Sequence, residues 1–180
     1  MNPFAELRQS FRGWAEILAA KADAEKNFRP DFTGLLIALG WFIVAVLLSV
    51  AGQSAAIGMP STIQIGFGLF AQAITLALLG IVMAQTLRFL KLEVPLNVLL
   101  VPVVYALAYM FVIAIPLALI GPNAALLAVL AVAYLIFCAG RTLARMKPGV
   151  AIAFALLCLI VLVVVPNALY IVLLQIPSPA

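Results

Sequence analysis

The chain has 180 residues, of which 67% are hydrophobic and only 9% are charged. A soluble domain has about a quarter of its residues charged, so this chain has too few charges to cover its apolar surface in water. The composition therefore excludes an ordinary soluble fold and predicts an integral membrane protein. The net charge of +4 does not indicate a nucleic-acid partner, because the basic residues are few and membrane insertion explains their spacing.

Residues 1–32 form the only long segment polar enough to lie in water, and they hold five of the ten basic and five of the six acidic residues. Asn2 and Pro3 are a favourable N-cap and first helical residue. After them, apolar side chains recur every three or four residues. On a helix they fall within an arc of roughly 80°. They are Phe4, Leu7, Phe11, Trp14 and Leu18.

Basic side chains flank this apolar arc, with Arg8 and Arg12 on one side and Lys21 on the other. Aromatic residues bordered by Arg and Lys are typical of a helix that lies in the membrane interface. We predict an amphipathic interfacial helix that contacts the membrane surface or a partner protein, followed by a short polar tether at residues 21–30. Packing of the same face on the chain's own spans stays open. The contact residues would be Phe4, Leu7, Arg8, Phe11, Arg12, Trp14 and Leu18.

Five apolar segments follow, each near or above the length that crosses a hydrocarbon core of about 30 Å. The first follows a long, acid-rich leader, so we expect a retained span rather than a cleaved signal peptide. The predicted fold is all-α: a polytopic membrane protein with five transmembrane helices plus an N-terminal amphipathic interfacial helix. The spans are about 33–52, 62–86, 95–120, 123–140 and 149–176, and 177–180 would be a short external tail.

The Lys and Arg residues alternate between segments in a way that predicts the orientation. The N-terminal segment has five, and the four loops that follow have none, two, none and three. With five spans, all ten basic residues lie on one side of the membrane. Cytoplasmic segments carry the excess of Lys and Arg, so the N-terminus is expected in the cytoplasm and the C-terminus outside. The short loops and compact chain favour a bacterial inner (plasma) membrane.

Residues that carry chemistry are scarce in the predicted spans. The chain has no histidine, and no Asp, Glu, Lys or Arg lies inside a span. Such intramembrane residues usually mark proton relays and active sites. Cys138 and Cys158 lie in apolar runs without a metal-binding spacing, which is typical of small core residues. We therefore expect no enzyme, no metal site and no cofactor.

A few neutral polar side chains interrupt the spans. In membrane helices such side chains often bond across to a neighbouring helix, and small residues beside them allow close approach. We therefore predict interhelical polar contacts at these positions. A path for a neutral solute along the amides is the alternative. The residues are Gln64, Gln72, Thr75 and Asn167.

Three short stretches resemble the Yip family, the Ypt-interacting five-span membrane proteins. Residues 31–35, DFTGL, are similar to the D-L-x-G-P element at the entry to the first span. Asp31 and Gly34 match, and Leu35 stands where the family has proline. Residues 99–102, LLVP, resemble the L-L-P end of a second element that closes on Pro102, without the Gly-Tyr that precedes it there. Residues 166–170, PNALY, resemble the P-x-x-L-x-Y ending of the last family span through Pro166 and Tyr170, with the tyrosine one place early.

The resemblance implies a role in membrane organisation or trafficking through contacts with partner proteins. Our hypothesis is thus a non-enzymatic, Yip-like integral membrane protein that organises membrane or binds partner proteins. The alternative is a small membrane subunit of a transporter or neutral-solute channel. The expected partners are the lipid bilayer and a membrane or cytoplasmic protein, and homo-oligomerisation stays open.

Overall fold

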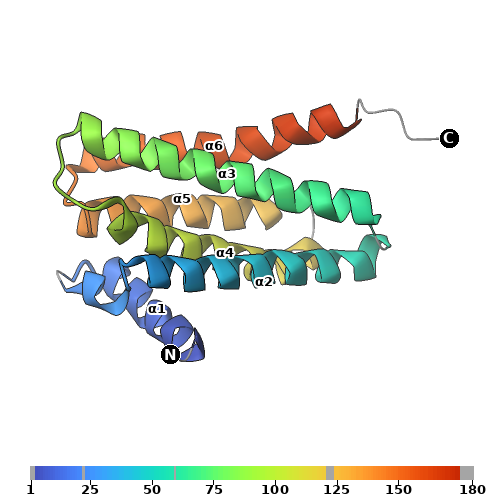
Figure 1. The fold of residues 1–180 in the computed structure, drawn as a ribbon, viewed down its shortest axis with the longest axis horizontal. Helices are drawn as coiled ribbons and strands as arrows, with labels where there is room; N and C mark the ends of the chain where they lie inside the picture. The colour runs from blue at the N-terminus through green and yellow to red at the C-terminus, as the bar shows by residue number, and fades with distance from the viewer. Residues whose placement is uncertain (1–2, 22, 59, 121–123, 175–180) are drawn as a thin grey trace.

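The computed structural model describes residues 3–21, 23–58, 60–120 and 124–174, and within them all regular structure is helical. A short amphipathic helix and one 3₁₀ turn precede five long helices (Figure 1). The elements are α1 (Pro3–Leu18), η1 (Ala24–Asn27), α2 (Phe32–Ile57), α3 (Thr62–Phe89), α4 (Leu96–Ile120), α5 (Ala124–Thr142) and α6 (Pro148–Leu174).

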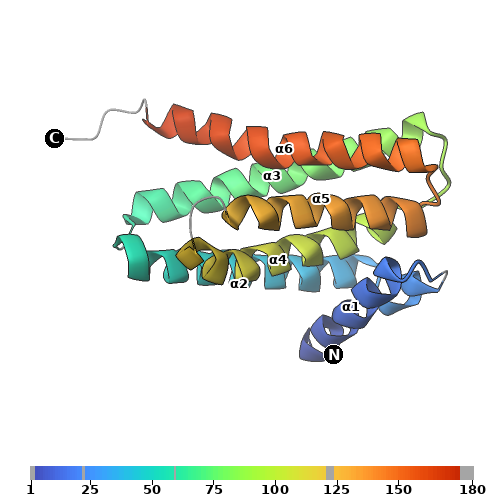
Figure 2. The ribbon, with the colours of Figure 1, turned by 180° about the vertical axis from the view of Figure 1, so that it is seen from behind.

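Helices α2 to α6 run up and down side by side, each antiparallel to the one before it (Figures 1 and 2). Four contain a stretch that is long and apolar enough to cross a membrane, as judged by length and composition. The apolar stretch of α5, Leu126–Thr142, is shorter. These helices are consistent with a polytopic membrane protein. The four stretches are Phe32–Gly52, Thr62–Phe89, Leu96–Leu117 and Pro148–Ile171.

Each of the five long helices packs against two or more of the others. Helix α4 packs closely against both α2 and α5. Helix α5 also packs against α6, and α6 packs against α3. Contact between α2 and α3 is sparse, although one short turn joins them. The helices therefore form a ring with one weak seam.

All sixteen ionisable Lys, Arg, Asp and Glu side chains lie at one end of this bundle. We call it the charged end. It comprises α1, η1, the start of α2, the loops 90–95 and 143–147, and the last turns of α3 and α5 (Figure 1). The opposite end carries the α2–α3 turn and the end of α6 (Figure 1). We call it the uncharged end.

The hydrophobic core is densest toward the charged end. In α4, residues 101–108 are all buried, among them Pro102, which is almost fully enclosed. Cys138 and Cys158 are buried and free, as expected of small core residues. Beyond Cys158, α6 has no buried side chain among the described residues. Packing therefore loosens from the middle of the bundle toward the uncharged end.

The structure corrects two predicted boundaries. Residues 53–57 are helical rather than part of a loop, because the helix continues until Gly58 ends it with φ of 93°. Only glycine adopts that backbone region readily. Residues 21–30 are not a simple tether, because Ala24 and Phe28 in this segment are buried in the core. The predicted tail 177–180 and the Asn2 cap lie outside the described residues.

Candidate functional site

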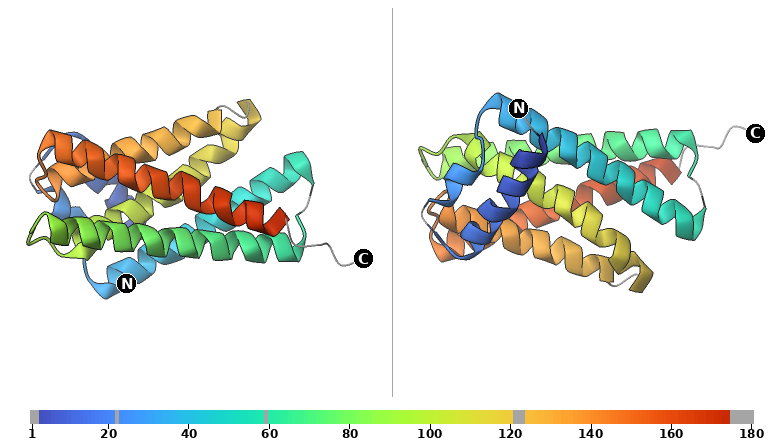
Figure 3. Two further views of the ribbon diagram at one scale, coloured as in Figure 1. Left: turned by 90° about the horizontal axis from the view of Figure 1, so that it is seen from above. Right: turned by 90° about the horizontal axis from the view of Figure 1, so that it is seen from below.

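Helix α1 lies across α4 at the charged end, with its first residues beside α2 and its last beside α5 (Figure 3). At the α2 side, the Trp41 indole donates to the main-chain oxygen of Pro3 at 3.2 Å. At the α5 side, the Thr142 hydroxyl donates to the main-chain oxygen of Ile17 at 3.3 Å. Polar contacts therefore attach both ends of α1 to the bundle.

A pair of hydroxyl groups, one of them buried, attaches the middle of α1 to α4. Ser10 is 1% exposed and donates to the main-chain oxygen of Leu7 at 2.7 Å. The same hydroxyl is hydrogen-bonded to the phenol of Tyr109 on α4. A serine hydroxyl has one proton to give, so the Tyr109 hydroxyl is the donor in the second bond.

The face of α1 that meets the bundle differs from the predicted apolar arc. Ser10, Gly13, Trp14 and Ile17 are buried, whereas part of the predicted arc faces outward. Trp14 is only 4% exposed and packs on Phe28, so it is not available to a membrane surface or partner. The predicted arc includes residues of the buried face and residues of the exposed face of α1. Hydrophobic periodicity predicts which residues are apolar neighbours on a helix, but not which other helix covers them. Phe4, Phe11 and Leu18 are exposed, and Leu7 is half-buried. The rings of Phe4 and Phe11 nevertheless pack on Trp41 of α2 and Tyr109 of α4, so part of the arc packs on the chain's own helices.

The segment after α1 folds back to cover it. A Cβ atom placed on Gly13 would lie 2.4 Å from the Phe28 ring, so the lack of a side chain there lets the ring approach the helix. The Asn27 amide donates to the Glu16 carboxylate. Helix α1 is therefore enclosed between this segment and the long helices along one face.

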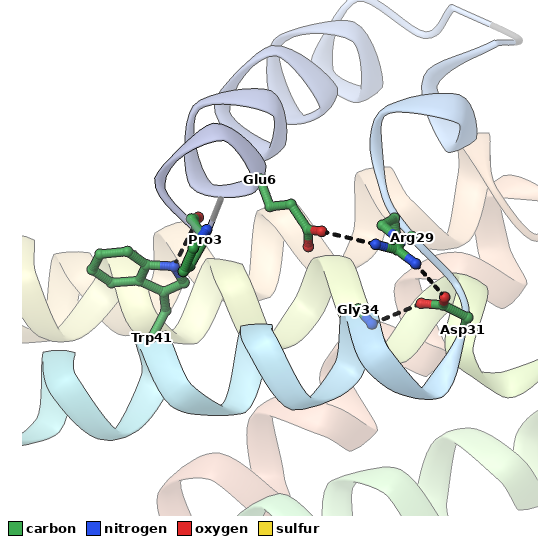
Figure 4. Close-up of polar contacts among 6 residues, drawn as sticks. All are labelled: Pro3, Glu6, Arg29, Asp31, Gly34 and Trp41. Atoms are coloured by element: carbon green, nitrogen blue, oxygen red, sulfur yellow. Dashed lines mark hydrogen bonds and ion pairs between the residues drawn. The ribbon is translucent and has the colours of Figure 1, made fainter. Parts of the chain in front are cut away.

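A polar network joins α1 to the start of α2 (Figure 4). The Arg29 guanidinium contacts Glu6 of α1 at 3.2 Å and Asp31 at 2.7 Å. The other oxygen of Asp31 accepts from the main-chain N–H of Gly34 at 2.7 Å, which caps α2. One guanidinium thus connects α1 to the residue that caps α2.

The electrostatics of this network favour its ionised form. The main-chain N–H of Gly34 and then the Arg29 guanidinium lower the pKa of Asp31 below its usual range. Hydrogen bonds to Asp31 and then Glu6 raise the pKa of Arg29. The capping carboxylate therefore stays charged at neutral pH.

Two basic side chains of α1 remain available. Arg8 and Arg12 are exposed and make no ion pair with the described residues. They lie one helical turn apart and line a shallow open groove together with Phe4, Gln9 and Asn27. Since Glu6 and Glu16 have partners, the outward face combines apolar and unpaired basic side chains.

Three of the four polar residues predicted to bond between helices bond locally instead. Gln64 forms a capping box with Ser61 at the start of α3. The Thr75 hydroxyl donates to the main-chain oxygen of Ala71 at 2.8 Å, and the Asn167 amide to that of Val163 at 2.7 Å. The physical reason is proximity. Thr and Asn side chains are short enough to reach a main-chain oxygen one turn earlier, and a Gln in the first turn of a helix can reach a free main-chain N–H.

Gln72 is the exception. It lines a cavity of about 180 Å³ in the middle of the bundle, to which α2 through α6 all contribute. Its amide has no hydrogen-bond partner in the described part of the chain. Thr75 and Pro166 line the same cavity, so tertiary structure brings three of the predicted residues together.

The remaining family-like positions have separate environments. Asp31 and Gly34 form the α2 cap, Pro102 is a core residue of α4, and Tyr170 is 57% exposed on α6. Sequence reasoning missed Tyr109 and Trp41 as partners of α1. Their position inside apolar runs gave no local signal, because both contacts join residues far apart in the chain.

Comparison with protein-family models, with curated proteins and with solved structures gives no match to this chain.

Proposed function

We propose that this chain is a non-enzymatic membrane protein that binds a partner protein through the outward face of α1. The observation that carries this proposal is the two-sided character of α1. One face is attached to the bundle by hydrogen bonds at both ends and the middle, and the other presents exposed Leu18, Arg8 and Arg12. A helix held in place presents those side chains with little further loss of conformational entropy on binding.

We place five spans in the bilayer, with the charged end in the cytoplasm. Helix α5 has 19 residues, about 28 Å at 1.5 Å per residue, which is close to the hydrocarbon thickness. Its antiparallel packing between α4 and α6 supports a fifth span. The gathering of all basic side chains at one end supports the orientation. The short loops favour a bacterial inner membrane.

The Yip-like character of the chain remains part of this proposal. Its support lies in the antiparallel layout of five long helices and in the position of Asp31 and Gly34 at the entry to α2. Capping and close backbone contact also explain these two residues without common ancestry.

Site-specific photocrosslinking tests partner binding. A photoreactive amino acid at Ala15, on the exposed face of α1, should give a protein adduct of defined mass in native membranes. The matched control places the same group at Ile160 on α6, which is 56% exposed far from α1. Reversing two charges, with Arg8→Glu and Arg12→Glu together, should remove the Ala15 adduct. Equal adducts at both positions, or an adduct unaffected by the charge reversal, would contradict the proposal.

A neutral-solute channel or transporter subunit is the second candidate, and the central cavity beside Gln72 favours it. Reconstituted protein would then move a neutral solute across vesicles, and Gln72→Leu would stop the flux. Absence of flux from vesicles that contain folded protein would exclude this candidate for the chain alone.

A further inference from the structure

The cavity in the middle of the bundle has the size and lining of a binding site. Its volume is about 180 Å³, and a cavity of about 150 Å³ in a protein interior holds a molecule the size of benzene. None of the side chains that line it is charged, and most are apolar. The Phe42 and Phe111 rings meet there edge to face, with centroids 5.7 Å apart. Such walls favour a neutral guest with a flat apolar body.

Two hydrogen-bonding groups belong to residues at the wall, the Gln72 amide and the main-chain oxygen of Leu162, which lacks its usual helical donor. The Gln72 amide, which both donates and accepts, is unpaired among the described residues. Pro166 has no N–H to donate to the main-chain oxygen of Leu162 one turn earlier, and both residues line the cavity. Gln72 lies ten residues into α3, about 15 Å from the uncharged end. An unpaired polar group at that depth costs free energy unless a guest bonds to it.

The cavity is closed toward the charged end. Leu79 and Met83 on α3, one and two turns beyond Thr75, are fully buried, as are Val103 and Val104 on α4. Toward the uncharged end, the described part of α6 has no buried residue. A cavity closed at one end can retain a guest.

We propose that this cavity binds a small neutral molecule with an aromatic-sized apolar body and one hydroxyl group, of which phenol is the simplest probe. The hydroxyl would donate to the Leu162 carbonyl or the Gln72 oxygen and accept from the Gln72 amide. This site is distinct from the outward face of α1 and does not depend on the proposed partner binding.

Photolabelling of the purified full-length chain in phosphatidylcholine nanodiscs tests the proposal. The probe is a diazirine-bearing phenol, and mass spectrometry locates the label. We expect label on cavity residues such as Leu76, Met110 and Phe111, with at least fivefold less label when phenol is in excess. Toluene, which lacks the hydroxyl, should compete several-fold less well.

Three variants separate the cavity from the lipid-facing surface. Gln72→Leu removes the amide and should reduce cavity labelling about fivefold, the size expected for one lost hydrogen bond. Val129→Phe fills the cavity while keeping Gln72, and should reduce labelling equally. Gln85→Leu is the matched control, because Gln85 is exposed on the same helix. It should label like the unaltered chain.

Several outcomes would overturn the proposal. They are label spread over lipid-facing residues such as Ile81 and Leu156, cavity label that phenol does not displace, and equal labelling of Gln72→Leu and Gln85→Leu. The first would indicate that the probe partitions into the lipid around the protein rather than binding in the cavity. The Ala15 crosslinking result is independent of all three, so failure of one proposal is distinguishable from failure of the other.

Discussion

The Oδ1 atom of Asp31 accepts a 2.7 Å hydrogen bond from the main-chain N–H of Gly34, and this bond caps α2. The same turn brings the main-chain oxygen of Arg29 close to Gly34, where a Cβ atom would lie only 2.2 Å from it. The first turn of α2 thus needs both an acceptor at position 31 and no side chain at position 34. Because Arg29 also pairs with Glu6, this turn anchors α1 as well.

Gly34→Ala should destabilise the protein. The new methyl group would collide with the Arg29 backbone, and overpacking of this kind costs about 1–3 kcal/mol. The measurement is the thermal unfolding midpoint of the purified protein in detergent. Gly40→Ala on the same helix is the control, since a Cβ atom there meets nothing within 4 Å. It should be neutral or stabilising, because alanine favours helix over glycine. Equal midpoints for the two variants would rule out the close contact.

The Asp31 cap should weaken only in acid. The folded-state pKa of Asp31 is lowered, so its stabilising contribution is complete above the unfolded pKa and is lost as the pH falls through the folded pKa. Comparing unfolding midpoints of the unaltered chain and Asp31→Asn should give a constant difference from pH 8 to 5. The difference should shrink below the ordinary carboxyl pKa of about 3.9. A difference that already shrinks near pH 6 would mean that the cap carboxylate is not stabilised by Gly34 and Arg29.

Ser10→Ala should release α1 more readily than Tyr109→Phe. Tyr109→Phe removes only the tyrosine hydroxyl and leaves Ser10 bonded to the Leu7 oxygen. Its cost in the free energy of unfolding is therefore about 0.5–1.5 kcal/mol. Ser10→Ala leaves the partly buried Tyr109 hydroxyl without this acceptor, at about 1–3 kcal/mol. The rate of trypsin cleavage after Arg12 reports opening of α1. In the double variant the two effects should not add. Full additivity would show that the two hydroxyls do not interact.

Fusion reporters test the topology. With five spans and the charged end in the cytoplasm, alkaline phosphatase fused to the C-terminus should be active. A fluorescent protein that folds only in the cytoplasm should be dark at the same position. The same pair fused at the loop 90–95 should report the opposite, because Arg88 and Lys91 favour a cytoplasmic position for that loop. A fluorescent C-terminal fusion would exclude the five-span arrangement.

The helices themselves could be predicted from local sequence, but the contacts of α1 could not. Apolar length locates the starts of α2 to α6 to within one residue, but it ends the first span five residues before α2 ends at Ile57. The partners of Ser10 and Pro3 are Tyr109 and Trp41, which lie 99 and 38 residues away. No pattern within a window of a few turns carries that information.

Sequence alone determined the all-helical, apolar character of this protein and the segregation of its charges, because both follow from composition and from short-range order along the chain. Only tertiary structure decided which aromatic of α1 is buried and which amide is left unpaired. Trp14 is enclosed because Phe28 covers it, whereas Phe11 is half exposed with its ring stacked on Tyr109 of α4. Gln64 caps its own helix while Gln72 faces a cavity, because five helices converge at the level of Gln72 without filling the space between them.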